Sequence, residues 1–392
     1  MAEPDTEAVR ARVAVGALFV ANGALFANVV PRYPDLKADL DLSNAAFGSA
    51  VAAYGAGALA AGLLAGVVVA RWGSGRVAPV STVAIGANLV LLGVAPSLLT
   101  LAAVLFVAGA MDSVADVAGN VHGLRVERRY GRSILNSLHG LWSVGAVVGG
   151  LMGAGAAGLA IPLVWHLSIA AAVFVGLALA ASRFVLPGHD DTDRTTTTGS
   201  RAAAGRARVA GAVVALGVIA ACAQVMEDAT ATWGAVYLRG DLGAAAAVGG
   251  LGFVALQGMQ TLGRLLADRV VTRYGDRAVA RVGAALAGCA MTAALVWPAA
   301  VTTVLAFGVV GLGIGTLIPA ALRTADTLPR LPSGAGVSLV GTLPRMALLG
   351  SPLLVGVTAD AYGLRVALAV IPLAALLVLC LASALPRAAA LR

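Results

Sequence analysis

Three polar side chains recur at a spacing of four residues inside an apolar stretch of the sequence. Asp112, Asp116 and Asn120 follow a run of apolar residues that begins at Leu98. Residues four apart on a helix share one face, so the two carboxyl groups and the amide are expected to point the same way. An ionisable group inside a membrane costs at least about 2.5 kcal/mol, which makes these acids candidates for moving protons or polar molecules.

The next apolar stretch adds an imidazole to this group. The basic sequence Gly123–Arg132 is expected to form a hairpin, after which His139 follows in the next helix. Two neighbouring helices would then bring His139 opposite Asp116 and Asn120. An imidazole there either joins a proton relay or ties the two helices together, and we favour the tie.

Charged residues also interrupt apolar stretches in the C-terminal half. At about 1.5 Å per helical residue, Asp112, Asp116 and Arg345 lie roughly 15, 9 and 12 Å from the predicted inner ends of their helices. We hypothesise that Arg345 pairs with Asp112, Asp116 or Glu227 in at least one conformation, and that protonation of the acid releases it. The alternatives are a static ion pair and, for Glu227, a solvated helix end.

Uncharged polar groups in several apolar stretches could contact a hydroxyl-bearing molecule. Asn22, Asn28 and Gln257 lie in stretches expected to line a central cavity, and we favour such contacts for these three. The alternative is a hydrogen bond between helices, which contributes about 0.6 kcal/mol in membrane proteins.

The composition places all of these residues in a membrane. Of the 392 residues, 59% are hydrophobic and 12% charged, with a mean hydropathy of +0.91, whereas soluble proteins carry about 25% charged residues. The net charge of +8 comes from arginines between apolar runs. The basic loops between these runs lack the interleaved aromatic residues of a nucleic-acid groove, so no nucleic-acid partner is expected.

Enzymatic and cofactor motifs are missing from the sequence. It contains no GxxxxGK[ST] phosphate loop, HExxH motif or GxSxG motif. The three cysteines are widely spaced inside apolar runs and form no metal-ligand pattern. We therefore expect neither enzymatic activity nor a cofactor or metal.

Twelve apolar runs are long enough to cross a bilayer, which takes about 20 residues. They predict an all-α membrane protein with two bundles of six helices, at residues 1–186 and 207–392, joined by a polar cytoplasmic linker at 187–206. The predicted spans are 12–30, 45–70, 77–95, 98–122, 134–157, 161–186, 208–235, 245–267, 278–297, 300–322, 335–358 and 364–386.

The distribution of basic residues predicts the orientation. With the N-terminus inside, only four of the 27 Lys and Arg residues fall in outer loops, namely Arg32, Lys37, Arg239 and Arg365. Cytoplasmic loops of membrane proteins are rich in Lys and Arg. Both termini are therefore predicted to lie in the cytoplasm, with the protein in the inner (cytoplasmic) membrane.

A short basic pattern repeats six spans apart. Arg71-Trp72-Gly73 follows the second span, and Arg273-Tyr274-Gly275 follows the eighth. Two parallel structural repeats would produce this pattern, and such repeats usually enclose a substrate site near the middle of the membrane.

These features resemble the major facilitator superfamily, whose signature of glycine, acid and basic residues lies between spans two and three. The first copy here has Ala70 in place of the acid, and the second copy is fuller. The residues that correspond to this cytoplasmic gating motif are Gly66, Arg71, Gly73, Arg76, Gly263, Arg264, Asp268 and Arg269.

Within this superfamily the chain is similar to a fucose-permease-like, largely uncharacterised bacterial branch. The similarity lies in Asp116–Asn120, Ser137–Ser143 and Glu227–Trp233. This similarity supports the branch rather than a particular substrate. Together with the polar residues described above, it leads us to expect a monomeric secondary transporter that moves a small, polar, sugar-like solute by alternating access, with proton coupling. The alternatives are a drug or secondary-metabolite exporter working as a proton antiporter and a membrane sensor without transport.

Overall fold

The computed structural model describes residues 6–132, 134–188, 206–328 and 335–387, and every regular element within these ranges is a helix. Contacts between residues divide the chain into two compact units, Met1–Thr192 with Ala245–Val254, and Asp193–Ala244 with Ala255–Arg392. The predicted linker lies mostly outside the described residues, so the predicted boundaries of the two bundles stay predictions.

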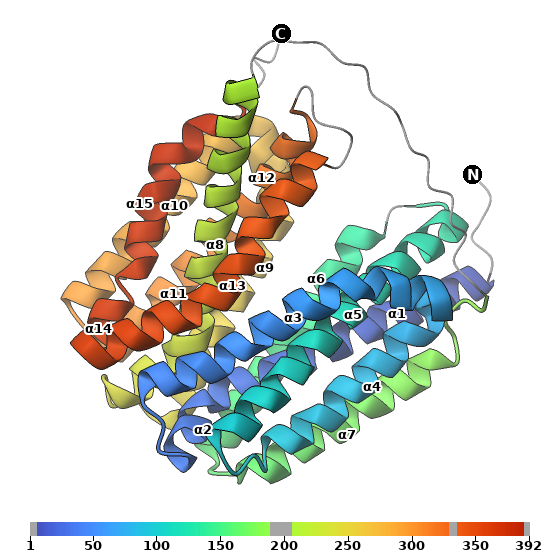
Figure 1. Cartoon of the computed structure of the whole chain (residues 1–392), viewed down its shortest axis with the longest axis horizontal. Helices are drawn as coiled ribbons and strands as arrows, with labels where there is room; N and C mark the ends of the chain where they lie inside the picture. The colour runs from blue at the N-terminus through green and yellow to red at the C-terminus, as the bar shows by residue number, and fades with distance from the viewer. Residues whose placement is uncertain (1–5, 133, 189–205, 329–334, 388–392) are drawn as a thin grey trace. The chain divides into compact units, whose positions relative to one another are not determined.

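Six long helices and two short ones form most of the first unit (Figure 1). Their bounds are α1 Thr6–Val29, η1 Val30–Arg32, α2 Tyr33–Asp39, α3 Asn44–Trp72, α4 Ser74–Leu92, α5 Leu98–Tyr130, α6 Leu135–Gly158 and α7 Leu163–Ser182.

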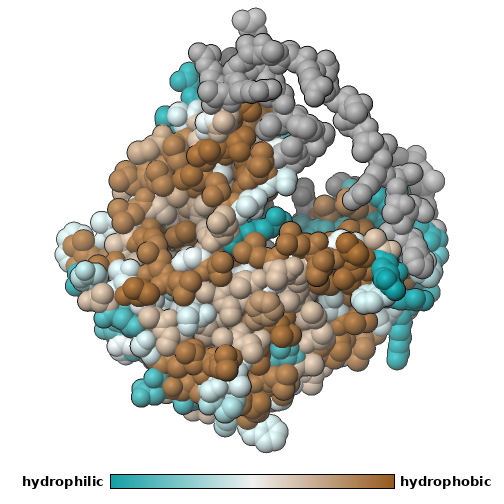
Figure 2. Space-filling model, in the orientation of Figure 1, coloured by the Kyte–Doolittle hydropathy of each residue, from teal (hydrophilic) through white to brown (hydrophobic). Residues whose placement is uncertain are grey.

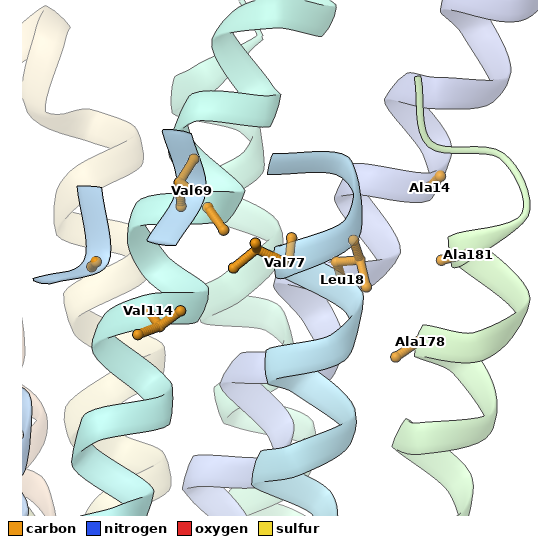
Figure 3. Packing of buried hydrophobic residues seen from close by; sticks show 10 residues of the cluster. Ala14, Leu18, Val69, Val77, Val114, Ala178 and Ala181 are labelled. Carbon is orange, nitrogen blue, oxygen red and sulfur yellow. The ribbon is translucent and has the colours of Figure 1, made fainter. Parts of the chain in front are cut away.

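Apolar side chains from five of these helices meet in one cluster of the first unit. Figure 3 shows Leu18 of α1, Val69 of α3, Val77 of α4, Val114 of α5 and Ala178 of α7 directed toward one another. Small residues dominate this cluster, as expected where helices in a membrane associate by close packing rather than by a hydrophobic driving force.

The second unit contains the remaining helices. Their bounds are α8 Arg206–Gly240, α9 Ala246–Tyr274, α10 Asp276–Val296, α11 Ala300–Ile314, α12 Leu317–Asp326, α13 Ala335–Tyr362, α14 Leu364–Ala367, α15 Val370–Leu381 and η2 Ala382–Ala384. The first nine residues of α9 belong by their contacts to the first unit. The predicted tenth span is broken between α11 and α12, just before Pro319.

Eleven helical segments of the described residues are long and apolar enough to cross a membrane. The one predicted span outside these eleven is the eighth, α9, which has 29 residues and is therefore roughly 40 Å long. Gln257 and Gln260 lower its hydropathy. Large side chains such as Leu63 and Val301 are 84% and 70% exposed, and Figure 2 shows hydrophobic residues over much of the visible face. Lipid is the environment that suits such a surface.

The basic hairpin predicted after Asn120 is wrong. Helix α5 continues for 33 residues to Tyr130 and ends at Gly131, whose φ is +73°. The segment contains good helix formers and neither proline nor a central glycine pair, and Arg128 and Arg129 lie in the last turn, where cations stabilise a helix. Among the described residues, Gly131 and Arg132 follow the helix as a turn.

The repeated basic, aromatic and glycine pattern has the same backbone conformation in both units. Gly73 ends α3 with φ +81°, and Gly275 ends α9 with φ +80°. Each glycine N–H donates to the carbonyl four residues earlier, at 2.8 Å from Val69 and 2.7 Å from Val271. A left-handed φ favours glycine because other residues clash there.

Candidate functional site

Four helices of the first unit converge on the carboxyl group of Asp112. Asn22 Nδ2 of α1 donates to Oδ1 at 2.9 Å, and Tyr54 OH of α3 donates to Oδ2 at 2.7 Å. Trp142 Nε1 of α6 donates to Asn22 Oδ1 at 2.7 Å. We call these four residues the Asp112 network.

Glycines bring the helices of this network close together. A Cβ atom on Gly23, next to Asn22, would lie 2.2 Å from the carbonyl oxygen of Trp142. A Cβ on Gly109, one turn before Asp112, would lie 1.9 Å from the carbonyl oxygen of Tyr54. Only glycine permits the backbones of two helices to approach so closely. This close packing brings the short side chains of Asn22 and Asp112 within reach of their partners.

The hydrogen bonds of the Asp112 network leave acceptor capacity on its carboxyl group. Each carboxyl oxygen accepts one hydrogen bond from the network, which leaves a further lone pair on each. All four side chains are half-buried, so the network is shielded from bulk water without being sealed. The phenol, amide and indole supply the mixture of hydrogen-bonding and aromatic surface that suits a hydroxyl-bearing solute.

A second group lies further along α5. Asn120 Nδ2 donates to both the carbonyl oxygen and Oδ1 of Asp116, each at 2.9 Å. Its Oδ1 lies 3.1 Å from His139 Nε2. Because the amide oxygen of Asn120 is able only to accept a hydrogen bond, His139 Nε2 carries the proton and donates in this contact. The ring of Phe19 packs edge-on against His139, with centroids 5.4 Å apart.

The spacing of the three residues on α5 therefore leads to two groups. Asp112 lies in the network with α1, α3 and α6, whereas Asp116 is exposed and bonded to Asn120. The juxtaposition of His139 with Asn120 follows the prediction from the sequence, and the contact joins α5 to α6. The sequence did not predict Tyr54 as a partner of Asp112, nor Trp142 as a partner of Asn22.

Asn28 is enclosed by protein. Its side chain is fully buried, Nδ2 donates to the carbonyl oxygen of Ala24 at 2.7 Å, and Oδ1 lies 2.9 Å from His166 Nε2 of α7. With both amide atoms occupied, Asn28 serves as a tie between α1 and α7 in this conformation. Contact with a transported molecule would require these bonds to break.

Carboxyl groups of α8 form a polar group in the second unit. Gln260 Nε2 of α9 donates to Glu227 Oε2 at 2.8 Å. The neighbouring Asp228 is buried and accepts a hydrogen bond from Thr232 at 3.3 Å. Gln257, one turn before Gln260, is 4% exposed.

Arg345 is exposed on α13 and forms no ion pair with the residues that the structure describes. Within its own unit, the carboxylate of Glu227 is bonded to Gln260 instead. The hypothesis that Arg345 pairs with an acid in another conformation stays a prediction.

Of the basic residues of the gating motif, Arg71 and Arg76 lie at the end of α3 and the start of α4, whereas Arg264 and Arg269 lie inside α9. Arg71, Arg76, Arg264 and Arg269 are exposed, and the side chain of Asp268 lies outside the described part of the chain. A Cβ on Gly66 would meet nothing within 4 Å, whereas one on Gly263 would lie 2.9 Å from the carbonyl oxygen of Leu312.

Each unit contains a polar contact that the sequence did not predict, and the two contacts join equivalent pairs of helices, one pair within each unit. Ser74 Oγ, at the start of α4, lies 3.0 Å from His122 Nδ1 of α5. Asp276, at the start of α10, pairs with Arg323 of α12 at 2.8 Å. The third and fourth spans and the ninth and tenth spans are thus joined at corresponding ends. Among the described residues, no cluster of three or more His, Cys, Asp or Glu side chains could hold a metal ion.

Known proteins resemble the chain over nearly its whole length. The chain is 29% identical to the uncharacterized transporter y4wD of Sinorhizobium fredii, over 95% of this chain and 97% of that protein. It is 27% identical to an uncharacterized MFS-type transporter of Yersinia pestis, over 95% and 94%.

Solved structures share the fold at low sequence identity. The nucleoside transporter NupG has a TM-score of 0.75 at 13% identity, with 97% of this chain and 99% of that chain covered. A D-xylose-proton symporter has a TM-score of 0.73 at 12% identity, with 97% and 98% covered.

The sequence profile of the Major Facilitator Superfamily matches residues 15–226, more than half of the chain. With the all-helical structure and the glycine turns repeated between its halves, this match shows that the chain is a multi-pass membrane protein that belongs to the Major Facilitator Superfamily of transporters.

Proposed function

We propose that this transporter moves a small, polar, hydroxyl-bearing organic solute across the cytoplasmic membrane by alternating access, and that it couples this movement to protons. The observation that carries the proposal is the Asp112 network, in which one carboxyl group receives hydrogen bonds from α1 and α3. An acid retained at membrane depth is typical of proton relays and substrate sites.

The network explains how proton and solute could share one site. Donors from Asn22 and Tyr54 stabilise the charged carboxylate, since hydrogen bonds to a charged group contribute about 1.5 to 3 kcal/mol. A solute hydroxyl that displaces one donor, or a proton that neutralises Asp112, would change this balance. Such differential binding is what allows a ligand to shift a conformational equilibrium.

Relatives of similar fold transport polar solutes. Two solved structures of similar fold are those of a nucleoside transporter and a D-xylose-proton symporter. At 12 to 13% identity these structures share the fold with this chain, and the substrate class proposed here rests on the polar groups of the first unit.

The test is transport by the purified protein in proteoliposomes, with and without a pH gradient. The panel contains monosaccharides, nucleosides and lipophilic cations. We expect accumulation of a polar solute that requires an inward proton gradient. Asp112→Asn is expected to abolish accumulation while retaining exchange of solute at equal concentrations, because it removes the protonatable group and keeps the shape.

Asp39→Asn is the matched control. Asp39 is an exposed acid at the end of α2, so this variant should transport like the wild type. Polar-solute transport that ignores the pH gradient would contradict proton coupling, and accumulation of lipophilic cations alone would support the exporter instead.

A further inference from the structure

An arginine-rich pocket lies in the first unit where α3 turns into α4. Its volume is about 680 Å³, and its lining includes Trp72, Arg76, Arg183 and Arg10. These residues come from the ends of α1, α3, α4 and α7, which the distribution of basic residues assigns to the cytoplasmic side.

A second pocket of about 380 Å³ lies in the second unit where α9 turns into α10. Tyr274, Arg277, Arg281 and Arg387 contribute to its lining. It lies at the corresponding helix ends of the second repeat.

The two pockets are built from the same parts. In each, an aromatic residue precedes the left-handed glycine of the turn. A Leu-Pro pair after the unit's last span also lies against the start of α4 or α10; it lines the first pocket and directly precedes Arg387 of the second. Gly75 faces the carbonyl oxygen of Leu186, which would lie 2.8 Å from a Cβ at that position. Arg277 N donates to the carbonyl oxygen of Pro386 at 3.0 Å. Since the pocket recurs with the repeat, it is part of the fold of each unit.

Among the residues that the structure describes, the arginines of the pockets outnumber the acids. No ion pair within this part of the chain involves the exposed arginines at positions 10, 76, 183, 281 and 387. Glu7 is the one described acid that lines either pocket, and it pairs with Arg129 at 2.5 Å. Three arginines around a cavity favour a phosphate group, because their planar guanidinium groups match its oxygens.

The surroundings of the pockets indicate that the anion carries acyl chains. Trp72 and Tyr274 are 58% and 55% exposed, and Val80 and Val282, on the helices that follow, are 66% and 59% exposed. Exposed tryptophan and tyrosine collect at the boundary between lipid headgroups and hydrocarbon. A dissolved phosphate would gain nothing from this apolar surface.

We propose that each pocket binds the headgroup of an anionic phospholipid of the inner leaflet. The arginines hold the phosphate oxygens, and Trp72 or Tyr274 packs against the boundary between headgroup and acyl chains. Basic pockets between membrane helices on the cytoplasmic side are suited to such headgroups.

The experiment titrates the purified full-length chain with phosphatidylglycerol and counts bound lipids by native mass spectrometry. Phosphatidylcholine is the neutral lipid, and inorganic phosphate is the anion without acyl chains. We expect two phosphatidylglycerol molecules to bind more tightly than phosphatidylcholine. Arg76→Gln with Arg183→Gln should weaken one site about 25-fold, at about fivefold for each arginine, and Arg281→Gln with Arg387→Gln should weaken the other equally.

The matched control replaces two exposed arginines outside the pockets, with Arg128→Gln and Arg132→Gln. The control should bind like the wild type. Arg76→Lys with Arg183→Lys should bind more tightly than the glutamine pair because the charge remains, and more weakly than the wild type because lysine lacks the planar guanidinium group. Equal losses in the control and pocket variants would overturn the proposal. So would equal binding of phosphatidylcholine, or binding of inorganic phosphate as tight as that of the lipid.

Discussion

At the scale of single residues, Asp112 differs from Asp116 in its partners rather than in its chemistry. Asp112 receives donors from α1 and α3, whereas Asp116 receives Asn120 from its own helix. When those helices move, a half-buried carboxylate with donors from other helices loses or changes its hydrogen bonds.

The hydroxyl of Tyr54 is predicted to contribute to transport through Asp112. Tyr54→Phe removes the donor to Oδ2 and keeps the ring, so we expect the transport rate to fall about tenfold, as for a lost hydrogen bond to a charged group. Tyr362→Phe, at a side chain that is 73% exposed, is the control. Initial rates of uptake in proteoliposomes measure the effect, and equal rates for both variants would exclude a role for this hydroxyl.

Arg345 is predicted to act in coupling. If it pairs with an acid in one conformation, Arg345→Gln should leave solute exchange intact and remove the dependence of transport on the pH gradient, because a neutral side chain no longer competes with the proton. Arg128→Gln serves as the exposed control. Full proton dependence in Arg345→Gln would contradict this hypothesis.

At the scale of helices, glycines decide which pairs pack closely. A Cβ on Gly57 would lie 1.9 Å from the carbonyl oxygen of Phe106, and Gly109 meets Tyr54 of α3 in the same way. In the second unit, a Cβ on Gly311 of α11 would lie 2.1 Å from the carbonyl oxygen of Leu256 of α9. The second and fourth spans and the eighth and tenth spans are thus paired by the same device, as expected of two repeats.

Gly57→Ala is predicted to separate α3 from α5. The added methyl group overlaps with backbone that is unable to turn away, so we expect a loss of about 1 to 3 kcal/mol in stability and a lower melting temperature in detergent. Gly176→Ala is the control, because a Cβ there meets nothing within 4 Å, and replacing glycine within a helix is neutral or stabilising. Equal melting temperatures for the two variants would show that the close contact between α3 and α5 does not determine the stability of the protein.

At the scale of the whole molecule, the distribution of arginines predicts the orientation in the membrane. We expect a single cysteine at Asp39, in a background without Cys222, Cys289 and Cys380, to react with an impermeant maleimide in intact cells. A cysteine at Arg128 should react only after the membrane is opened. Labelling in the opposite order would reverse the predicted topology, and with it the assignment of the two arginine-rich pockets to the inner leaflet.

The sequence determined the class of protein, the spans and the repeat, because each depends on local properties. Hydropathy over about 20 residues locates a span, and a glycine that follows a basic and an aromatic residue locates the turn at Gly73 and again at Gly275. The break of the tenth span just before Pro319 is likewise a local feature, because proline acts on its own helix. The span at 245–267, within α9, was also predicted from its apolar residues and its length, although its glutamines lower its hydropathy.

Only the tertiary structure decided which polar residues act together. Residues four apart on a helix differ by about 40° in direction, so the three residues on α5 drift around the helix. Asp112 faces partners on α1 and α3, while Asn120 faces α6. Tyr54 and Asn22 lie 58 and 90 residues from Asp112. Their contact depends on close helix packing at glycines, which spacing along a single helix does not encode.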